Sequence, residues 1–130
     1  MPTAQPTHFA FYVSSHGFGH CTRASAVTTA LLAGGHKVTI VTNAPPGPFT
    51  AVLDPSPSNE HLNGNYASYR KRDVDPGMVQ PKAYDVAREA TVDLLTTFLA
   101  RRDQTITEEV QWIKGNQVQA VLSDATFLGW

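Results

Sequence analysis

The sequence predicts an α/β fold, a Rossmann-like parallel sheet of about four strands with flanking helices. Three runs rich in apolar and β-branched residues have the length of strands: residues 8–14, 37–42 and 118–123. Nearly continuous runs of this kind are typical of strands that helices cover on both faces. Helical patterns separate them, and such strand, helix, strand sequences form right-handed parallel crossovers. We expect the strand order 3-2-1-4.

Length and composition fit a single domain over residues 1–130. Ten basic residues stand against eleven acidic ones, and no run of one sign is longer than residues 70–72. We expect that triplet to be a solvated strand end, and we predict no nucleic-acid partner. Cys21 is the only cysteine, so no internal disulfide can form and the cytoplasm is the expected location. The apolar run at residues 9–13 is too short to span a membrane.

The first strand leads through a glycine-bearing turn into a helix. Ala24, Val27 and Leu31 recur at helical spacing and indicate its buried face. Gly34 and Gly35 predict its C-terminal end.

The second strand ends in a proline-rich segment. Residues 43–48 contain three prolines and a glycine, so we expect a loop at the carboxyl edge of the sheet. This Pro/Ser/Asn-rich region extends to residue 65, with a helical turn at residues 49–53. Residues 66–70 alternate in polarity and predict a third strand at the sheet edge.

Residues 82–114 predict one long helix, or two in tandem with a break near residues 101–103. Its expected buried stripe consists of Val86, Ala90, Leu94, Phe98, Ile106, Val110 and Ile113. Residues 118–123 form the last strand and bring Asp124 to its carboxyl end. We expect residues 125–130 to open another helix.

The chemistry is expected in residues 14–23. Gly17 and Gly19 lie between a strand and a helix, where backbone N–H groups and the helix dipole favour an anion or a sugar. The carboxyl ends of parallel strands meet at one edge of the sheet, so this turn, Asn43 and Asp124 should lie close together.

Other kinds of site fit this stretch less well. A dinucleotide site would need a glycine where Thr22 stands and an acid where Asn43 follows the second strand, and no P-loop sequence occurs. His16 and His20 are four residues apart, but Gly17 and Gly19 disfavour a regular helix there. No carboxylate lies nearby in sequence to complete a ligand set, so we expect no metal.

His20 and Asp124 are the candidate catalytic pair. An aspartate that accepts from one imidazole nitrogen raises the basicity of the other, which would make the pair a general base for a hydroxyl. Arg23 is a candidate clamp for a phosphate or carboxylate. Simpler interpretations stay open: a histidine packed within the turn, a solvated Arg23, and Asp124 as the cap of a following helix.

Three segments in the correct order carry a resemblance to a known family. They are the turn His16-Gly17-Phe18-Gly19-His20 with Thr22 and Arg23, residues 31–45, and residues 109–112 leading into 121–124. On these segments the chain resembles the N-terminal domain of GT-B glycosyltransferases, most closely the glycosyltransferase-like N-terminal region of L-arabinokinase-type proteins. The resemblance implies an incomplete GT-B N-terminal domain.

In such glycosyltransferases the N-terminal domain holds the acceptor, and a histidine of the glycine turn, paired with an aspartate after a later strand, deprotonates it. His20 and Asp124 fall on those positions, and Arg23 falls where related enzymes approach a phosphate. We therefore expect these two as catalytic residues and ligand or phosphate binding by His16, Gly17, Phe18, Gly19, Arg23 and Asn43.

We expect the acceptor-side half of a GT-B-like glycosyltransferase, truncated or stand-alone, that acts on a hydroxyl or sugar acceptor. No cofactor is expected, since the nucleotide sugar is a co-substrate that binds mainly in a C-terminal domain of this fold. A C-terminal domain or a partner chain would complete the site, and the chain alone should not transfer sugar efficiently. The alternatives are a non-catalytic module that binds a sugar or nucleotide, and an oligomerisation module that forms a homodimer through the open edge at residues 118–123.

Overall fold

The computed structural model describes residues 5–53, 62 and 64–126. In this part of the chain, four parallel strands form one sheet in the order β3-β2-β1-β4, which confirms the predicted fold class and strand order. The strands are β1 (His8–Val13), β2 (Lys37–Thr42), β3 (Ser68–Lys71) and β4 (Ala120–Asp124). The helices are α1 (Phe18–Ala33), the 3-10 helix η1 (Gly47–Phe49), α2 (Thr50–Leu53) and α3 (Arg88–Gly115).

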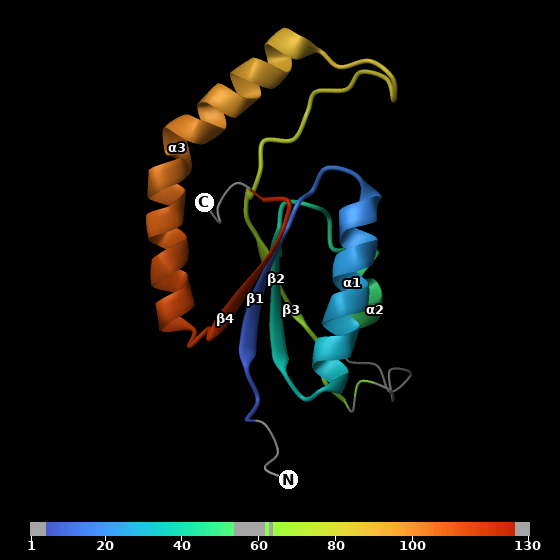
Figure 1. Cartoon of the computed structure of the whole chain (residues 1–130), viewed down its shortest axis with the longest axis vertical. Helices are drawn as coiled ribbons and strands as arrows, with labels where there is room; N and C mark the ends of the chain where they lie inside the picture. The colour runs from blue at the N-terminus through green and yellow to red at the C-terminus, as the bar shows by residue number, and fades with distance from the viewer. Residues whose placement is uncertain (1–4, 54–61, 63, 127–130) are drawn as a thin grey trace.

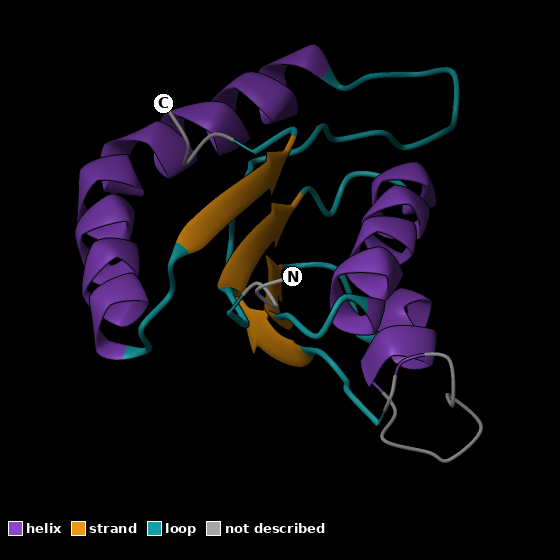
Figure 2. Cartoon of the chain, turned by 60° about the horizontal axis from the view of Figure 1, so that its bottom comes forward, coloured by secondary structure: helices purple, strands orange, loops and turns teal. Residues whose placement is uncertain are grey.

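The sheet lies between α1 and α2 on one face and α3 on the other (Figures 1 and 2). Along β1, Phe11 and Val13 belong to the apolar cluster with α1, whereas Ala10 and Tyr12 belong to the cluster with α3. All four are buried. Because helices cover both faces of the sheet, this strand has an almost continuous run of apolar residues.

The buried face of α1 is rotated from the predicted one. Its buried residues are Cys21, Ala24, Thr28 and Leu32, whereas Val27 is exposed and Leu31 only partly buried. Ala24 of the predicted face is thus confirmed, whereas Cys21, Thr28 and Leu32 were not predicted. The side chains that meet the sheet are mostly small, which lets the helix approach closely. The predicted end at Gly34 and Gly35 is confirmed.

The helix α3 is continuous over 28 residues, which confirms the first alternative, one long helix, and excludes a break near residues 101–103. Its axis nevertheless bends about midway (Figure 1). Thr96 and Thr107 donate hydrogen bonds back to the carbonyl oxygens of Val92 and Asp103, four residues earlier, and such bonds bend helices. The helix also begins later than predicted, because Lys82 and Asp85 pair across a turn instead.

Only part of the predicted apolar stripe of α3 faces the sheet: Ile113 packs against the apolar cluster there. Leu94 and Val110 of that stripe are exposed, and the residue of α3 that is fully buried is Glu109, 4% exposed. The Tyr12 hydroxyl donates to Glu109 Oε2 at 2.7 Å. Burial, together with this glutamate, raises the pKa of Tyr12 above its ordinary value, so the phenol stays a donor. A charge therefore anchors α3 to the sheet.

Two arginines at the end of β3 neutralise that charge. Arg70 Nη1 lies 3.0 Å from Glu109 Oε1, and Arg72 Nε lies 3.1 Å from the same oxygen. Arg72 also pairs with Glu108, and the Arg70 guanidinium lies 4.7 Å above the centre of the Trp112 ring. The expectation of a solvated strand end at residues 70–72 is thus wrong for Arg70 and Arg72, because α3 covers the end of β3.

The remaining differences are small. The helix η1 includes Pro48, so the proline-rich loop is shorter than predicted; η1 and α2 confirm the expected helical turn. Part of the region up to residue 65, and residues 127–130, lie outside the described residues. The sequence predicts a helix that begins at residue 125. Ala125 has a φ of +57°, so a helix does not begin at this residue. None of the helices described is long and apolar enough to cross a membrane.

Replacing Glu109 by alanine should lower the free energy of unfolding by about 3 kcal/mol, because Tyr12 would lose its hydrogen-bond acceptor and Arg70 and Arg72 would lose the buried carboxylate with which they are ion-paired. Tyr12→Phe removes one hydrogen bond to a charged group and should cost about 1.5 kcal/mol. Urea denaturation measures both. Glu108→Ala is the matched control, since Glu108 also pairs with Arg72 but its side chain is 42% exposed. Equal losses for the two glutamate variants would contradict the anchoring role.

Candidate functional site

The turn between β1 and α1 has an open outer surface. Gly17 has φ +83°, a conformation that favours glycine, and α1 begins at the next residue without a side-chain cap. No atom lies within 4 Å of where a Cβ on Gly17 or Gly19 would stand, and Phe18 is exposed. Ser14 Oγ accepts a hydrogen bond from the His16 backbone N–H at 3.2 Å. The start of α1 is therefore accessible to a ligand.

Asp124 is held at the end of β4 by main-chain contacts. It pairs in register with Val13, and the Ser14 N–H donates to its carbonyl oxygen at 3.1 Å. The hydroxyls of Ser123 and Thr126 lie 2.7 Å apart beside it. The strand pairing thus places the Asp124 side chain opposite the first turns of α1.

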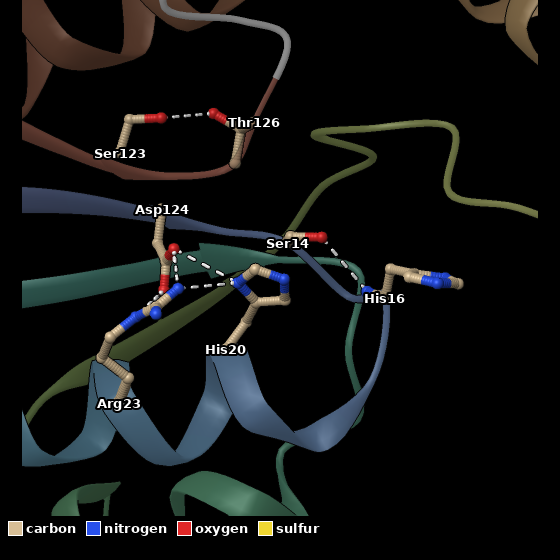
Figure 3. A network of polar contacts seen from close by, with 7 residues as sticks. All are labelled: Ser14, His16, His20, Arg23, Ser123, Asp124 and Thr126. Atoms are coloured by element: carbon tan, nitrogen blue, oxygen red, sulfur yellow. Dashed lines mark hydrogen bonds and ion pairs between the residues drawn. The ribbon is translucent and has the colours of Figure 1, made fainter.

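His20, Arg23 and Asp124 form one cluster (Figure 3). His20 Nδ1 lies 3.2 Å from Asp124 Oδ1. Arg23 donates through Nε to Oδ2 at 3.0 Å and through Nη2 to Oδ1 at 2.6 Å. Its Nη2 also lies 3.1 Å from His20 Nδ1. The carboxylate is mostly buried, whereas the Arg23 side chain is 63% exposed.

The charges in this cluster stabilise one another. Hydrogen bonding from Arg23 lowers the pKa of Asp124 below its ordinary value, against the opposing effect of burial, and His20 adds to the lowering. Hydrogen bonding to Asp124 raises the pKa of Arg23. Asp124 is therefore an ionised carboxylate with two neighbours that compete for it. Sequence reasoning paired it with His20 and missed its bidentate contact with Arg23.

His16 lies apart from this cluster. Its ring is directed away from His20 (Figure 3), and its Nδ1 is 3.6 Å from the place where a Cβ on Gly77 would stand. Among the residues described, no group of three or more histidine, cysteine, aspartate or glutamate side chains could hold a metal ion.

Asn43 lines a cavity of about 640 Å³ at the same edge of the sheet. The wall is built by the segment after β3 and the N-terminal half of α3, and includes Arg72, Asp75, Leu94 and Phe98. Asp75 is only 8% exposed, and its Oδ2 has no hydrogen-bond partner in the described structure. The volume and the mixed apolar and polar lining are typical of small-molecule sites.

Sequence reasoning assigned Asn43 to a site but missed Asp75. The sequence Asp75-Pro76-Gly77 is typical of a turn and does not by itself indicate a site. Its position just after an edge strand, at the carboxyl edge where ligands bind, was the signal that could have identified this carboxylate.

The fold and the cluster define a Rossmann-like α/β protein with a histidine, an arginine and an aspartate at the carboxyl edge of its sheet. The chain is similar to L-arabinokinase of Arabidopsis thaliana, with 37% identity over 117 residues. The match covers 89% of this chain and 10% of that protein, so the chain spans about a tenth of its relative. No protein-family model and no solved structure matches the sequence.

The lowered pKa of Asp124 predicts a pH-dependent contribution to stability. As pH falls below about 4, the ordinary range for aspartate, the unfolded chain takes up the proton first. The contribution is fully present above that range and is lost as pH falls through the folded-state pKa. The free energy of unfolding should therefore fall more steeply in acid for the unsubstituted protein than for Asp124→Asn.

Urea denaturation at several pH values measures this difference. Asp103→Asn, which changes a fully exposed carboxylate on α3, is the control and should leave the acid dependence unchanged. Parallel curves for the unsubstituted protein and Asp124→Asn would contradict the prediction.

Proposed function

We propose that this chain is the acceptor-side half of a GT-B-like glycosyltransferase. Completed by a C-terminal donor domain or a partner chain, it would transfer a glycosyl group from a nucleotide sugar to a hydroxyl acceptor. The observation that carries the proposal is the 3.2 Å contact between His20 Nδ1 and Asp124 Oδ1 at the carboxyl edge of the sheet. A carboxylate on Nδ1 leaves Nε2 as the basic nitrogen.

In the proposed reaction, His20 Nε2 takes the proton of the acceptor hydroxyl. The acceptor oxygen attacks the anomeric carbon, and the bond from that carbon to the donor phosphate breaks with inversion. The nucleoside diphosphate leaves with the bonding electrons, while Asp124 stabilises the imidazolium. Arg23 and the backbone N–H groups at the start of α1 stabilise the leaving phosphate.

The cavity at the same edge of the sheet is the proposed acceptor site. Asn43 offers amide donors and an acceptor, the unpartnered Asp75 oxygen can accept a hydroxyl, and Phe98 can pack against the apolar face of a sugar ring. The similar protein is named as a kinase of L-arabinose, which supports a sugar as the class of acceptor.

His20→Ala, introduced into the natural full-length protein, should lower the rate of glycosyl transfer roughly 100- to 10,000-fold, the contribution of a general base. Acceptor affinity should fall far less than the rate, because the cavity residues would hold most of the acceptor and only its reacting hydroxyl would extend to His20. Rate assays and calorimetry measure the two effects. Arg88→Gln, at the start of α3, is the control. Unchanged turnover in His20→Ala would show that His20 is not the base.

The alternative is a non-catalytic module that holds a sugar or nucleotide at the same edge. Calorimetry with free sugars and with nucleotide sugars separates the two functions. Sugar binding by the full-length protein without transfer or hydrolysis would support the module. Asp75→Asn should weaken sugar binding under either function, because it replaces a buried carboxyl oxygen that has no partner in the described structure by an amide group.

A second proposal is a homodimer through β4. This strand is at the edge of the sheet, its Val121 is exposed, and open edges pair readily with another chain. Sedimentation velocity over a range of concentrations should show a dimer that Val121→Lys weakens, since edge lysines oppose pairing. A monomer at all concentrations would exclude the dimer.

A further inference from the structure

The Nδ1 atom of His20 has two neighbours that require opposite protonation states. Asp124 Oδ1, at 3.2 Å, can only accept a hydrogen bond, so this contact needs a proton on Nδ1. Arg23 Nη2, at 3.1 Å, can only donate, so that contact needs a lone pair on Nδ1. A neutral imidazole satisfies only one of these contacts at a time. The two distances are nearly equal, so Arg23 offsets the preference that Asp124 imposes.

The choice between these states decides whether His20 can act as a base. With the proton on Nδ1, Nε2 has a lone pair and can take a proton from a hydroxyl. With the proton on Nε2, that nitrogen is a donor and cannot. A guanidinium at 3.1 Å also opposes the positive charge that the ring acquires during proton transfer.

We propose that Arg23 is a positioning residue that holds His20 away from the base-competent tautomer until an anionic group, such as a diphosphate, draws the guanidinium off Asp124. His20 Nδ1–H then donates to Asp124, and Nε2 becomes free. Anion binding and base activation would in this way be coupled. The inference rests on the proposed function for its biological use, but the tautomer switch can be measured without any transfer reaction.

Two features of the cluster favour an anion as the trigger. Arg23 is 63% exposed, so its guanidinium can turn to a ligand without opening the core. Its planar fork, which now holds the two Asp124 oxygens at 3.0 and 2.6 Å, matches two phosphate oxygens equally well. Asp124 stays in place when Arg23 leaves, because the Ser14 N–H and the pairing with β1 hold its backbone.

Long-range ¹H–¹⁵N correlation spectra of His20 report which ring nitrogen carries the proton. At a pH above the range in which imidazoles titrate, Arg23→Met should shift the tautomer ratio toward Nδ1–H by roughly tenfold, the factor expected for one competing charge-assisted hydrogen bond. Methionine keeps an aliphatic stem but has no donor. Arg23→Lys, which keeps the charge but not the fork, should give an intermediate ratio.

Pyrophosphate added to the unsubstituted protein should cause the same shift, compared with chloride at equal ionic strength. It should have no effect on Arg23→Met, while Arg88→Gln should respond like the unsubstituted protein. A fully Nδ1–H His20 without anion, or the same ratio in Arg23→Met, would overturn the role of Arg23. A response of Arg23→Met to pyrophosphate, or none from the unsubstituted protein, would overturn the coupling. Absence of glycosyl transfer with an intact switch would refute the proposed function alone.

Discussion

Glu109 connects three parts of the fold. It accepts a hydrogen bond from Tyr12 of β1 and pairs with Arg70 and Arg72 at the end of β3, while it is itself the buried residue of α3. Ion pairs depend on direction and spacing more strongly than apolar contacts do, so this glutamate fixes where α3 crosses the sheet. The cavity follows from that position, because its wall lies between α3 and the segment after β3.

Two clusters of polar side chains lie toward the carboxyl edge of the sheet, one around Glu109 and one around Asp124. One, around Glu109, is buried and its charges are neutralised within the fold. The other, around Asp124, has a partly exposed histidine and a largely exposed arginine. A buried pair stabilises a position, whereas an exposed arginine can exchange partners with a ligand. This difference in exposure is why we place the chemistry at Asp124 and a structural role at Glu109.

The sequence predicted the sheet well because parallel strands covered on both faces are marked by continuous apolar runs, as in β1 and β2. It predicted the face of α1 less well, since Thr28 and Cys21 are not large apolar residues. The burial of Glu109 could not be predicted, because its partners lie on β1 and β3, far away in sequence. The proximity of His20 and Asp124 could be inferred, because both follow parallel strands and the carboxyl ends of such strands meet at one edge of the sheet. The bidentate ion pair of Arg23 with Asp124 could not, because it depends on the conformation of a long, exposed side chain.

The pairing of β1 with β4 also has a consequence during synthesis of the protein. His20 and Asp124 are 104 positions apart, and β4 emerges from the ribosome after all the other elements described. Until then, His20 and Arg23 lack the carboxylate that they share in the finished fold. A chain interrupted before Asp124 would therefore keep most of the fold's residues, together with His20 and Arg23, but would lose the acid that brings the two into one cluster.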